Sequence, residues 1–230
     1  MIQYLIGFII VLLLLSYSVL PTYAYRLRQL ILKASNPSTD RIYLTFDDGP
    51  DTRYTEAILD LLKELGIKAS FFVVASFAER NPHIIERMKK DGHCIGLHSL
   101  EHKDGLYKMP SYVKQDFNKS LLILKNLDVE ISCYRPPWGH FNLTAMMQIR
   151  KYGLKPIMWD VMAQDWRGDT TAQVIAQKLK KRTKKGTIIC LHDGRGENDA
   201  PQRTLEALRA ALPILLARGL RFDTVDNYGK

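Results

Sequence analysis

The chain has 230 residues and a mass of 26.4 kDa, which is enough for one domain with a sizeable hydrophobic core. Hydrophobic residues make up 46% and charged residues 25% of the sequence, which argues against a disordered, collagen-like or multi-span membrane protein. The 33 Lys and Arg residues outnumber the 24 Asp and Glu residues, giving a net charge of +9. That charge is compatible with a nucleic acid, an anionic membrane or an anionic polymer as partner, and does not choose among them.

The first 25 residues contain no charged side chain and no histidine. Residues 8–15 are an unbroken aliphatic and aromatic run, and the apolar stretch ends near Leu20, just before Pro21. A helix of about 20 apolar residues crosses a hydrocarbon core of ~30 Å. Residues 1–25 are therefore predicted to be a transmembrane or signal-anchor helix, which would make this a single-pass protein of the cell membrane.

Other interpretations of this segment stay open. The small residues near Ala24 suit cleavage of a signal peptide, which would release the protein, although no Lys or Arg precedes the apolar run. A buried core helix rarely runs this long without a polar face. Three basic residues, Arg26, Arg28 and Lys33, follow the segment, and the positive-inside rule would leave the domain in the cytoplasm. The substrate considered below favours an extracytoplasmic domain instead.

After an expected linker over residues 26–40, the chain alternates short apolar runs with longer segments of helical period. The helical segments commonly close with a glycine, as at Gly66 after residues 56–65. Residues 41–230 are therefore expected to form one domain of alternating strands and helices. The predicted strands are 42–46, 70–74, 94–97, 132–134, 156–159, 187–191 and 221–225.

Strands separated by helices at this spacing predict βαβ units with parallel strands, in either an open sheet or a closed barrel. Neither G-x-G-x-x-G nor G-x-x-x-x-G-K-[ST] follows the first strand, so no nucleotide-binding motif favours the open sheet. A barrel-like α/β array is expected. No helix-turn-helix, RRM or zinc-finger spacing occurs, so nucleic acid is not expected as a partner.

The three cysteines, Cys94, Cys133 and Cys190, form no C-x-x-C pair and are too few for a disulfide framework. Each lies in a strand-like apolar run, where unpaired cysteine is commonly a small buried hydrophobe. No chemistry is assigned to them.

Five predicted strands end in residues that bind metals or transfer protons. In a parallel β/α array the carboxyl ends of the strands meet at one rim, so these side chains are expected to lie close together. They are Asp47 and Asp48, His98, Arg135, Asp160 followed by Asp165, and His192 followed by Asp193.

His98 and His102 stand four residues apart, so a helical turn or a tight loop can bring both rings to one face, as a metal site requires. Asp47 or Asp48 could supply a third protein ligand and leave a position open for water. The other aspartate would then be free to act as a base. A simple turn over residues 48–51 accounts for the Gly and Pro there, but not for two acids after a buried strand.

Five short motifs occur in order along the domain: Thr45-Phe46-Asp47-Asp48-Gly49-Pro50, His98-Ser99-x-x-His102, Arg135-Pro136-Pro137-Trp138-Gly139, Asp165-Trp166 and Leu191-His192. In order, spacing and residue type they resemble those of the polysaccharide deacetylase family, also called the NodB homology domain or carbohydrate esterase family 4. The resemblance spans residues 41–228 and implies a distorted (β/α)7 barrel, which agrees with the seven strands counted above.

The resemblance implies a divalent metal, with Zn²⁺ first and Co²⁺, Ni²⁺ or Mn²⁺ as alternatives, held by Asp48, His98 and His102. It also implies that Asp47 is the general base that activates a metal-bound water. Arg135 would hold Asp47 in position and favour its ionised form. A metal lowers the pKa of its bound water towards ~7 and stabilises an anionic intermediate, which suits this set of residues.

His192 would be the general acid for a departing amine, with Asp165 paired to it to keep the imidazolium available. One carboxylate and one histidine suffice for amide hydrolysis, which removes a proton from water and delivers one to nitrogen. The resemblance further implies a substrate pocket lined by Pro137, Trp138, Trp166 and Leu191.

The fourth motif departs from the family pattern, because many members have another acid a few residues before the Asp-Trp pair and this chain has Met162. The departure leaves Asp165 and Trp166 in place and bears on the shape of that loop and on substrate specificity.

Taken together, the sequence predicts a membrane-anchored, monomeric, metal-dependent hydrolase that removes N-acetyl groups from N-acetylglucosamine units. Peptidoglycan is the first choice of substrate, and chitooligosaccharide, exopolysaccharide and lipid-linked sugar are the alternatives. A related deformylase or amidase, and a non-catalytic glycan-binding protein, are the other two hypotheses.

Overall fold

A computed structural model describes residues 1–35 and 40–229; residues 36–39 of the expected linker, and Lys230, lie outside the described residues. All strand pairs among the described residues are parallel, and the sheet has the order β5-β4-β3-β2-β1-β7-β6, with β8 paired to β1. The strands are β1 Arg41–Asp47, β2 Ser70–Val74, β3 Cys94–Ser99, β4 Cys133–Tyr134, β5 Lys155–Pro156, β6 Val161–Met162, β7 Ile188–His192 and β8 Arg221–Asp223.

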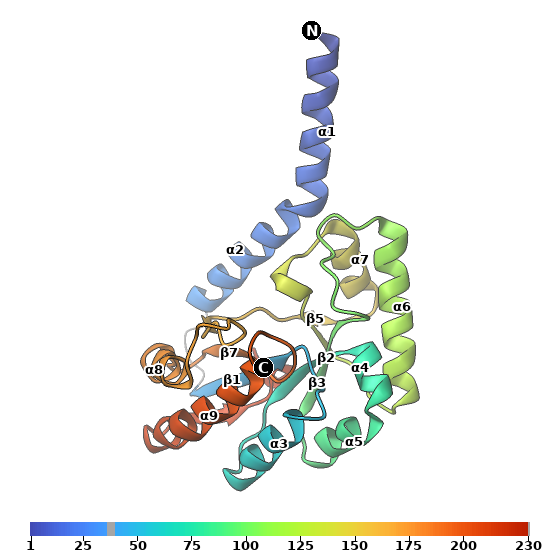
Figure 1. The fold of residues 1–230 in the computed structure, drawn as a ribbon. Coiled ribbons are helices and arrows are strands. Elements are labelled where there is room, and N and C mark those ends of the chain that lie inside the picture. Colours follow the sequence, from blue (N-terminus) through green and yellow to red (C-terminus); the bar gives the residue numbers. More distant parts are fainter. Residues whose placement is uncertain (36–39, 230) are drawn as a thin grey trace.

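Helices cover the outside of this curved sheet (Figure 1). In chain order they are α1 Ile2–Ser18, α2 Leu20–Ser35, α3 Thr55–Glu64, α4 Ala75–Arg80, α5 Pro82–Lys90, α6 Pro110–Asn126, α7 Leu143–Lys151, α8 Ala172–Arg182 and α9 Ala200–Ala217, with 3-10 turns at Pro137–Gly139 and Val225–Asn227. The described strands thus form a parallel α/β half-barrel, the class of fold that the alternating pattern predicts and one that is consistent with a distorted (β/α)7 barrel.

Of the predicted strand at 156–159, only Pro156 lies in a strand, β5, which pairs with β4. A second short strand, β6, follows at residues 161–162 and pairs with β7 at the other end of the sheet. Between them, the Ile157 amide donates to the Tyr134 carbonyl at 2.9 Å, and the Asp160 amide donates to the Ile188 carbonyl at 2.9 Å. This one segment therefore bridges the two ends of the sheet. Because Pro156 has no amide to donate, the pairing of β5 is short.

Successive side chains of each strand point to opposite faces of the sheet, so one set packs against the helices and the other faces the barrel interior. On β1, Leu44 and Phe46 face the helices, and the Phe46 ring stacks on Phe71 at a centroid distance of 5.0 Å. Tyr43 instead belongs to a second apolar cluster with Phe72, Cys133, Ile157, Ile188 and Val225. The next inward positions of β1 are Thr45 and Asp47, so the interior changes from apolar to polar towards the carboxyl ends of the strands.

The N-terminal helices differ from each other. Helix α1 projects away from the domain and its apolar side chains are exposed, whereas α2 bends back along the domain (Figure 1). No single helix among the described residues is long and apolar enough to cross a membrane by itself. Residues Ile2–Ser18 and Leu20–Ile31 meet that criterion together, as a pair bent by 44°.

Helix α2 occupies residues 26–35 of the expected linker and packs against the β5–β6 segment. The Tyr25 hydroxyl donates to the Pro156 carbonyl, and the Arg26 guanidinium lies 5.5 Å from the centre of the Trp159 ring. Lys33 forms an ion pair with Asp160. Basic side chains of this helical stretch thus find partners on the barrel.

Candidate active site

Asp48, His98 and His102 lie together at the carboxyl ends of β1 and β3. The Nε2 atoms of His98 and His102 are 3.2 and 2.8 Å from Asp48 Oδ1. The two histidines are brought together by a tight loop and not by a helix: His102 has a positive φ of 52°, and its amide donates to Ser99 Oγ at 2.9 Å. Asp48 also has a positive φ, 74°, which turns its side chain away from the direction of Asp47.

This cluster has the chemistry of a metal site. His98 Nδ1 lies 2.8 Å from the Arg135 carbonyl oxygen, which can only accept, so Nδ1 carries the proton and Nε2 presents a lone pair. That lone pair faces Asp48 Oδ1, a buried atom that accepts no hydrogen bond. The lone pair of His98 Nε2 and the carboxylate oxygen of Asp48 face each other, and such a pair favours a cation between them.

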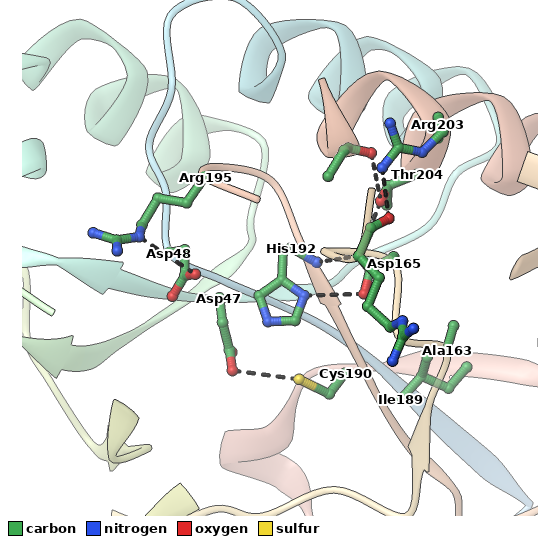
Figure 2. A network of polar contacts seen from close by, with 12 residues as sticks. Asp47, Asp48, Ala163, Asp165, Ile189, Cys190, His192, Arg195, Arg203 and Thr204 are labelled. Atoms are coloured by element: carbon green, nitrogen blue, oxygen red, sulfur yellow. Dashed lines mark hydrogen bonds and ion pairs between the residues drawn. The ribbon is translucent and has the colours of Figure 1, made fainter. Parts of the chain in front are cut away.

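Asp47 lies inside the barrel, one residue before this cluster. Its Oδ1 accepts from Arg135 Nη1 at 2.6 Å. Its Oδ2 accepts from the Cys190 thiol at 3.3 Å, a contact drawn in Figure 2. Arg135 is fully buried and also donates to Thr45 Oγ1 at 2.7 Å and to the Ile157 carbonyl at 3.2 Å. These bonds fix both oxygens of the Asp47 carboxylate.

The layers beneath Asp47 explain how a guanidinium can be buried there. Arg135 lies over the face of Phe72, with its central carbon 4.2 Å from the ring centre. Phe72 in turn lies over Gly96, where an added Cβ would come within 2.7 Å of the ring. The missing side chain at Gly96 therefore makes room for the ring that supports Arg135.

His192, at the end of β7, is held by Asp165 from the loop before α8 (Figure 2). The imidazole Nδ1 and the His192 amide lie 3.0 and 2.8 Å from the two carboxylate oxygens, and Thr204 of α9 donates to Oδ2 at 2.9 Å. Burial alone would lower the pKa of His192, but the charge and hydrogen bond of Asp165 outweigh it and raise the pKa to about 10. The ring is therefore a protonated imidazolium at neutral pH.

Asp193 supports the loop that carries Asp48. It accepts from Thr55 Oγ1 at 2.7 Å, and its carboxylate fills the space beside Gly49, where a Cβ would lie only 2.5 Å from Cγ. Burial raises the pKa of Asp193 to about 7. Arg195 reaches to 3.9 Å from Asp48 Oδ2 on the open side (Figure 2).

The expected substrate-contacting residues fall into two groups. Trp138 is 52% exposed and its ring centre lies 4.4 Å from that of His102, while the Trp166 ring meets His192 edge-on at 5.3 Å. Both indoles border the polar cluster. Pro137 is buried, and Leu191 is fully buried in the cluster that packs the sheet against the helices.

The structure thus brings together the seven predicted polar residues from five strand ends, and adds partners that the sequence analysis did not assign. Cys190 donates a hydrogen bond to Asp47, and Thr204 donates one to Asp165. Asp193, which accepts from Thr55, supports the loop that carries Asp48. Of these, only Asp193 carried a signal in the sequence, as a carboxylate next to His192 at a strand end. The other contacts join residues 39 to 143 positions apart.

Comparison with known proteins agrees with this geometry. The family model for polysaccharide deacetylase matches residues 34–157. A peptidoglycan-N-acetylglucosamine deacetylase of Bacillus cereus is 32% identical over 194 residues, covering 83% of this chain and 89% of that protein. The chain belongs to the polysaccharide deacetylase family. A chitooligosaccharide deacetylase of Azorhizobium caulinodans is 31% identical over 188 residues, covering 77% of this chain and 89% of that protein.

Solved structures of the family have the same fold. The Bc1960 peptidoglycan N-acetylglucosamine deacetylase superposes with a TM-score of 0.77 at 28% identity, covering 83% of this chain and 88% of that one. The peptidoglycan deacetylase PdaC of Bacillus subtilis gives 0.75 at 27% identity, covering 84% and 91%. Enzymes of the family are metal-dependent, and the structure of a Clostridium thermocellum acetyl xylan esterase contains a cobalt ion.

Proposed function

We propose that this protein is a metal-dependent hydrolase that removes acetyl groups from N-acetylglucosamine units of peptidoglycan, releasing acetate and leaving a free amine. The observation that carries the proposal is the arrangement of Asp47, His192 and the Asp48–His98–His102 cluster at one end of the barrel. A base and an acid thus flank a site with the donor set of a divalent metal.

Asp48, His98 and His102 would hold the metal, which when bound polarises the acetyl carbonyl and lowers the pKa of a bound water. The remaining steps belong to the chain itself. The Asp47 carboxylate, fixed by Arg135, accepts the proton of the attacking water. The new bond joins the water oxygen to the acetyl carbon.

His192 supplies the second proton transfer. Its Nδ1 is engaged by Asp165, which leaves Nε2 as the atom that protonates the amide nitrogen while the carbon–nitrogen bond breaks. Because the imidazolium is the stable form at neutral pH, the acid is ready before the substrate binds. Trp138 and Trp166 provide apolar walls for the sugar ring and the acetyl methyl group. Pro137 would shape the pocket from beneath, whereas Leu191 packs between the sheet and the helices.

The donor set of one carboxylate and two imidazoles fits Zn²⁺ first, and also Co²⁺, Ni²⁺ or Mn²⁺. The choice of peptidoglycan rests on the relatives named for that substrate. Chitooligosaccharide is the second candidate, since a relative of comparable identity is named for it.

We further propose that α1 inserts into the cell membrane as a single pass, that residues 41–230 form the catalytic domain, and that this domain works outside the cytoplasm as a monomer. Helix α1 has no charged residue, and its apolar side chains are exposed along its length. Such a helix is stabilised by lipid.

The decisive experiment measures acetate released from peptidoglycan and from chitooligosaccharides by the full chain loaded with Zn²⁺ or Co²⁺. We expect Asp47→Asn to lower kcat by about 10²- to 10⁴-fold, because the base is lost while the metal ligands stay. Metal content measured on the same samples should be unchanged. The matched control is Asp169→Asn, an exposed carboxylate paired with Arg167.

Equal activity of wild type and Asp47→Asn, including none in both, would contradict the proposal and favour a glycan-binding protein. Formate or ammonia as product would instead identify a related deformylase or amidase.

A further inference from the structure

A group of exposed apolar side chains lies on the catalytic domain beside the base of α1. Four residues, between 50% and 74% exposed, belong to the loop after His102 and to the first turns of α7. We call them the apolar rim: Tyr107, Met109, Leu143 and Met147. Leu143 and Met147 stand four residues apart on α7 and therefore share one face of that helix.

Hydrogen bonds tie this rim to the end of α1. The Tyr17 hydroxyl donates to the Lys108 carbonyl at 3.0 Å and lies 3.1 Å from Thr144 Oγ1. Lys108 is the residue between Tyr107 and Met109, and Thr144 directly follows Leu143. The Tyr17 side chain thus stands between the two halves of the apolar rim.

A second link fixes the same junction. Thr22 Oγ1 donates to the Phe141 carbonyl at 3.0 Å and accepts from the Phe141 amide at 2.8 Å. The Tyr25 ring packs on Phe141 at 5.1 Å. Because Thr22 is also buried, the start of α2 is docked on the loop that joins β4 to α7, and α1 leaves the domain from a fixed point.

The length of α1 then determines where a membrane surface would lie. Its 17 residues span about 25 Å, less than the ~30 Å of a hydrocarbon core. A helix shorter than the hydrocarbon core is accommodated by local thinning of the bilayer and by snorkelling of the residues that flank the helix. The surface would therefore lie at Tyr17 and Ser18, which is where the apolar rim is attached. An aromatic side chain such as Tyr17 is typical of this level.

We infer that the apolar rim rests on the bilayer into which α1 inserts, and that the active site consequently works on glycan held close to the membrane surface. This inference rests on the anchoring proposed above. Only four residues separate His102 from Tyr107. Trp138, whose ring packs on His102, lies three residues before Phe141 in the loop that Thr22 binds. Lys108 adds a positive charge that suits anionic headgroups.

The test uses the full chain in vesicles of phosphatidylcholine and phosphatidylglycerol. An environment-sensitive dye is attached at Met109→Cys or Met147→Cys, and its quenching by lipids that carry a doxyl group on the acyl chain is measured. Leu12→Cys on α1 reports insertion. Leu122→Cys on α6 and Ile214→Cys on α9 are the matched controls, since both are exposed apolar residues on other helices. Wild type treated with the same dye gives the background from the native cysteines.

We expect strong quenching at residue 12, clear quenching at residues 109 and 147, and none at residues 122 and 214. Quenching at residue 12 without quenching at 109 and 147 would overturn the rim contact and leave the anchor intact. No quenching at residue 12 would overturn both. A blue-shifted but unquenched dye at 109 and 147 would indicate a protein partner or a second copy of this chain, and would also overturn the inference.

An activity measurement separates membrane contact from catalysis. The variant Leu143→Glu with Met147→Glu should keep the wild-type rate on soluble chitooligosaccharide, because neither residue touches the site. On an N-acetylglucosamine-bearing lipid presented in the same vesicles its rate should fall several-fold, because two charged side chains disfavour contact with the bilayer. Equal loss on both substrates, or no loss on either, would contradict the inference.

Discussion

Asp47 and Asp48 are neighbours with different surroundings, and the backbone is the cause. Asp47 continues the inward alternation of β1 and meets Arg135, whereas the positive φ of Asp48 directs its carboxylate to His98 and His102. A division of roles within the pair was predictable from the sequence, because two acids after a buried strand are hard to explain as a turn. Cys190 and Thr204 were not predictable as partners, since their contacts depend on how distant strands and helices pack.

The protonation of His192 should depend on Asp165. In Asp165→Asn the charge that raises the pKa of His192 is gone while the imidazole stays buried, and an opposite charge at this distance is worth about 1–3 pKa units. We expect the alkaline limb of the kcat profile to move to lower pH by about that amount. Activity against pH for wild type and variant, at fixed metal loading, measures this. Coincident alkaline limbs would contradict the assignment of His192 as the acid.

The same pair makes stability depend on pH. The pKa of His192 is about 10 in the folded chain against an ordinary value of 6.5, so protonation favours the folded state. This stabilisation is complete below about pH 6.5 and is lost as the pH rises towards 10. In Asp165→Asn the pKa of His192 lies closer to 6.5, so this part of the pH dependence should be smaller. Chemical unfolding of wild type and variant at several pH values between 6 and 10 checks this.

Cys190 should matter through its hydrogen bond to Asp47. Burial and the neighbouring Asp47 charge raise the pKa of the thiol well above its usual value, so the thiol keeps its proton and donates it. Cys190→Val keeps the volume but removes the donor, and a net hydrogen bond of about 0.5–1 kcal/mol predicts a two- to fivefold lower kcat. Cys190→Ser, which keeps a donor, should restore most of the rate. Similar losses in both variants would point to packing instead.

At the level of elements, the strands and their ends were predictable and the connections between them less so. The predicted strand at 70–74 is β2 itself, and Gly66 ends α3 with the expected positive φ of 65°. The end of β5 at Pro156 and the separate strand β6 were not predictable from the sequence, because they reflect pairing with β4 on one side and β7 on the other. The helical course of residues 26–35 depends on contacts with the barrel that local pattern does not encode.

The loop after β1 is an element whose tightness can be tested. In Gly49→Ala the new Cβ would overlap the Asp193 carboxylate, so either Asp193 or the Asp48 loop must move. We expect weaker metal binding, by about 10- to 100-fold, as is usual when groups that orient metal ligands are disturbed. Competition with a chelator measures the affinity. Gly105→Ala is the control, because its Cβ would meet only the Asn142 amide, at 3.8 Å. An unchanged affinity in Gly49→Ala would show that Asp193 does not set the ligand geometry.

For the whole molecule, metal and fold should be linked. Asp48, His98 and His102 come from two strand ends that meet only in the folded barrel, so the metal binds the folded chain preferentially. At a free metal concentration about 100 times the Kd, the expected stabilisation is about 2.7 kcal/mol, or a rise in Tm of about 5–10 °C. Calorimetry before and after chelation checks this. His98→Ala should lower the Tm and lose the response to metal.

The contacts of α2 with Pro156, Trp159 and Asp160 place a helix from outside the barrel on the segment that joins the two ends of its sheet. A chain that began at Arg41, where the first strand starts, would therefore leave this segment without the contacts of Tyr25, Arg26 and Lys33. Helix α2 is in this sense part of the wall of the domain, although it precedes the first strand of the sheet.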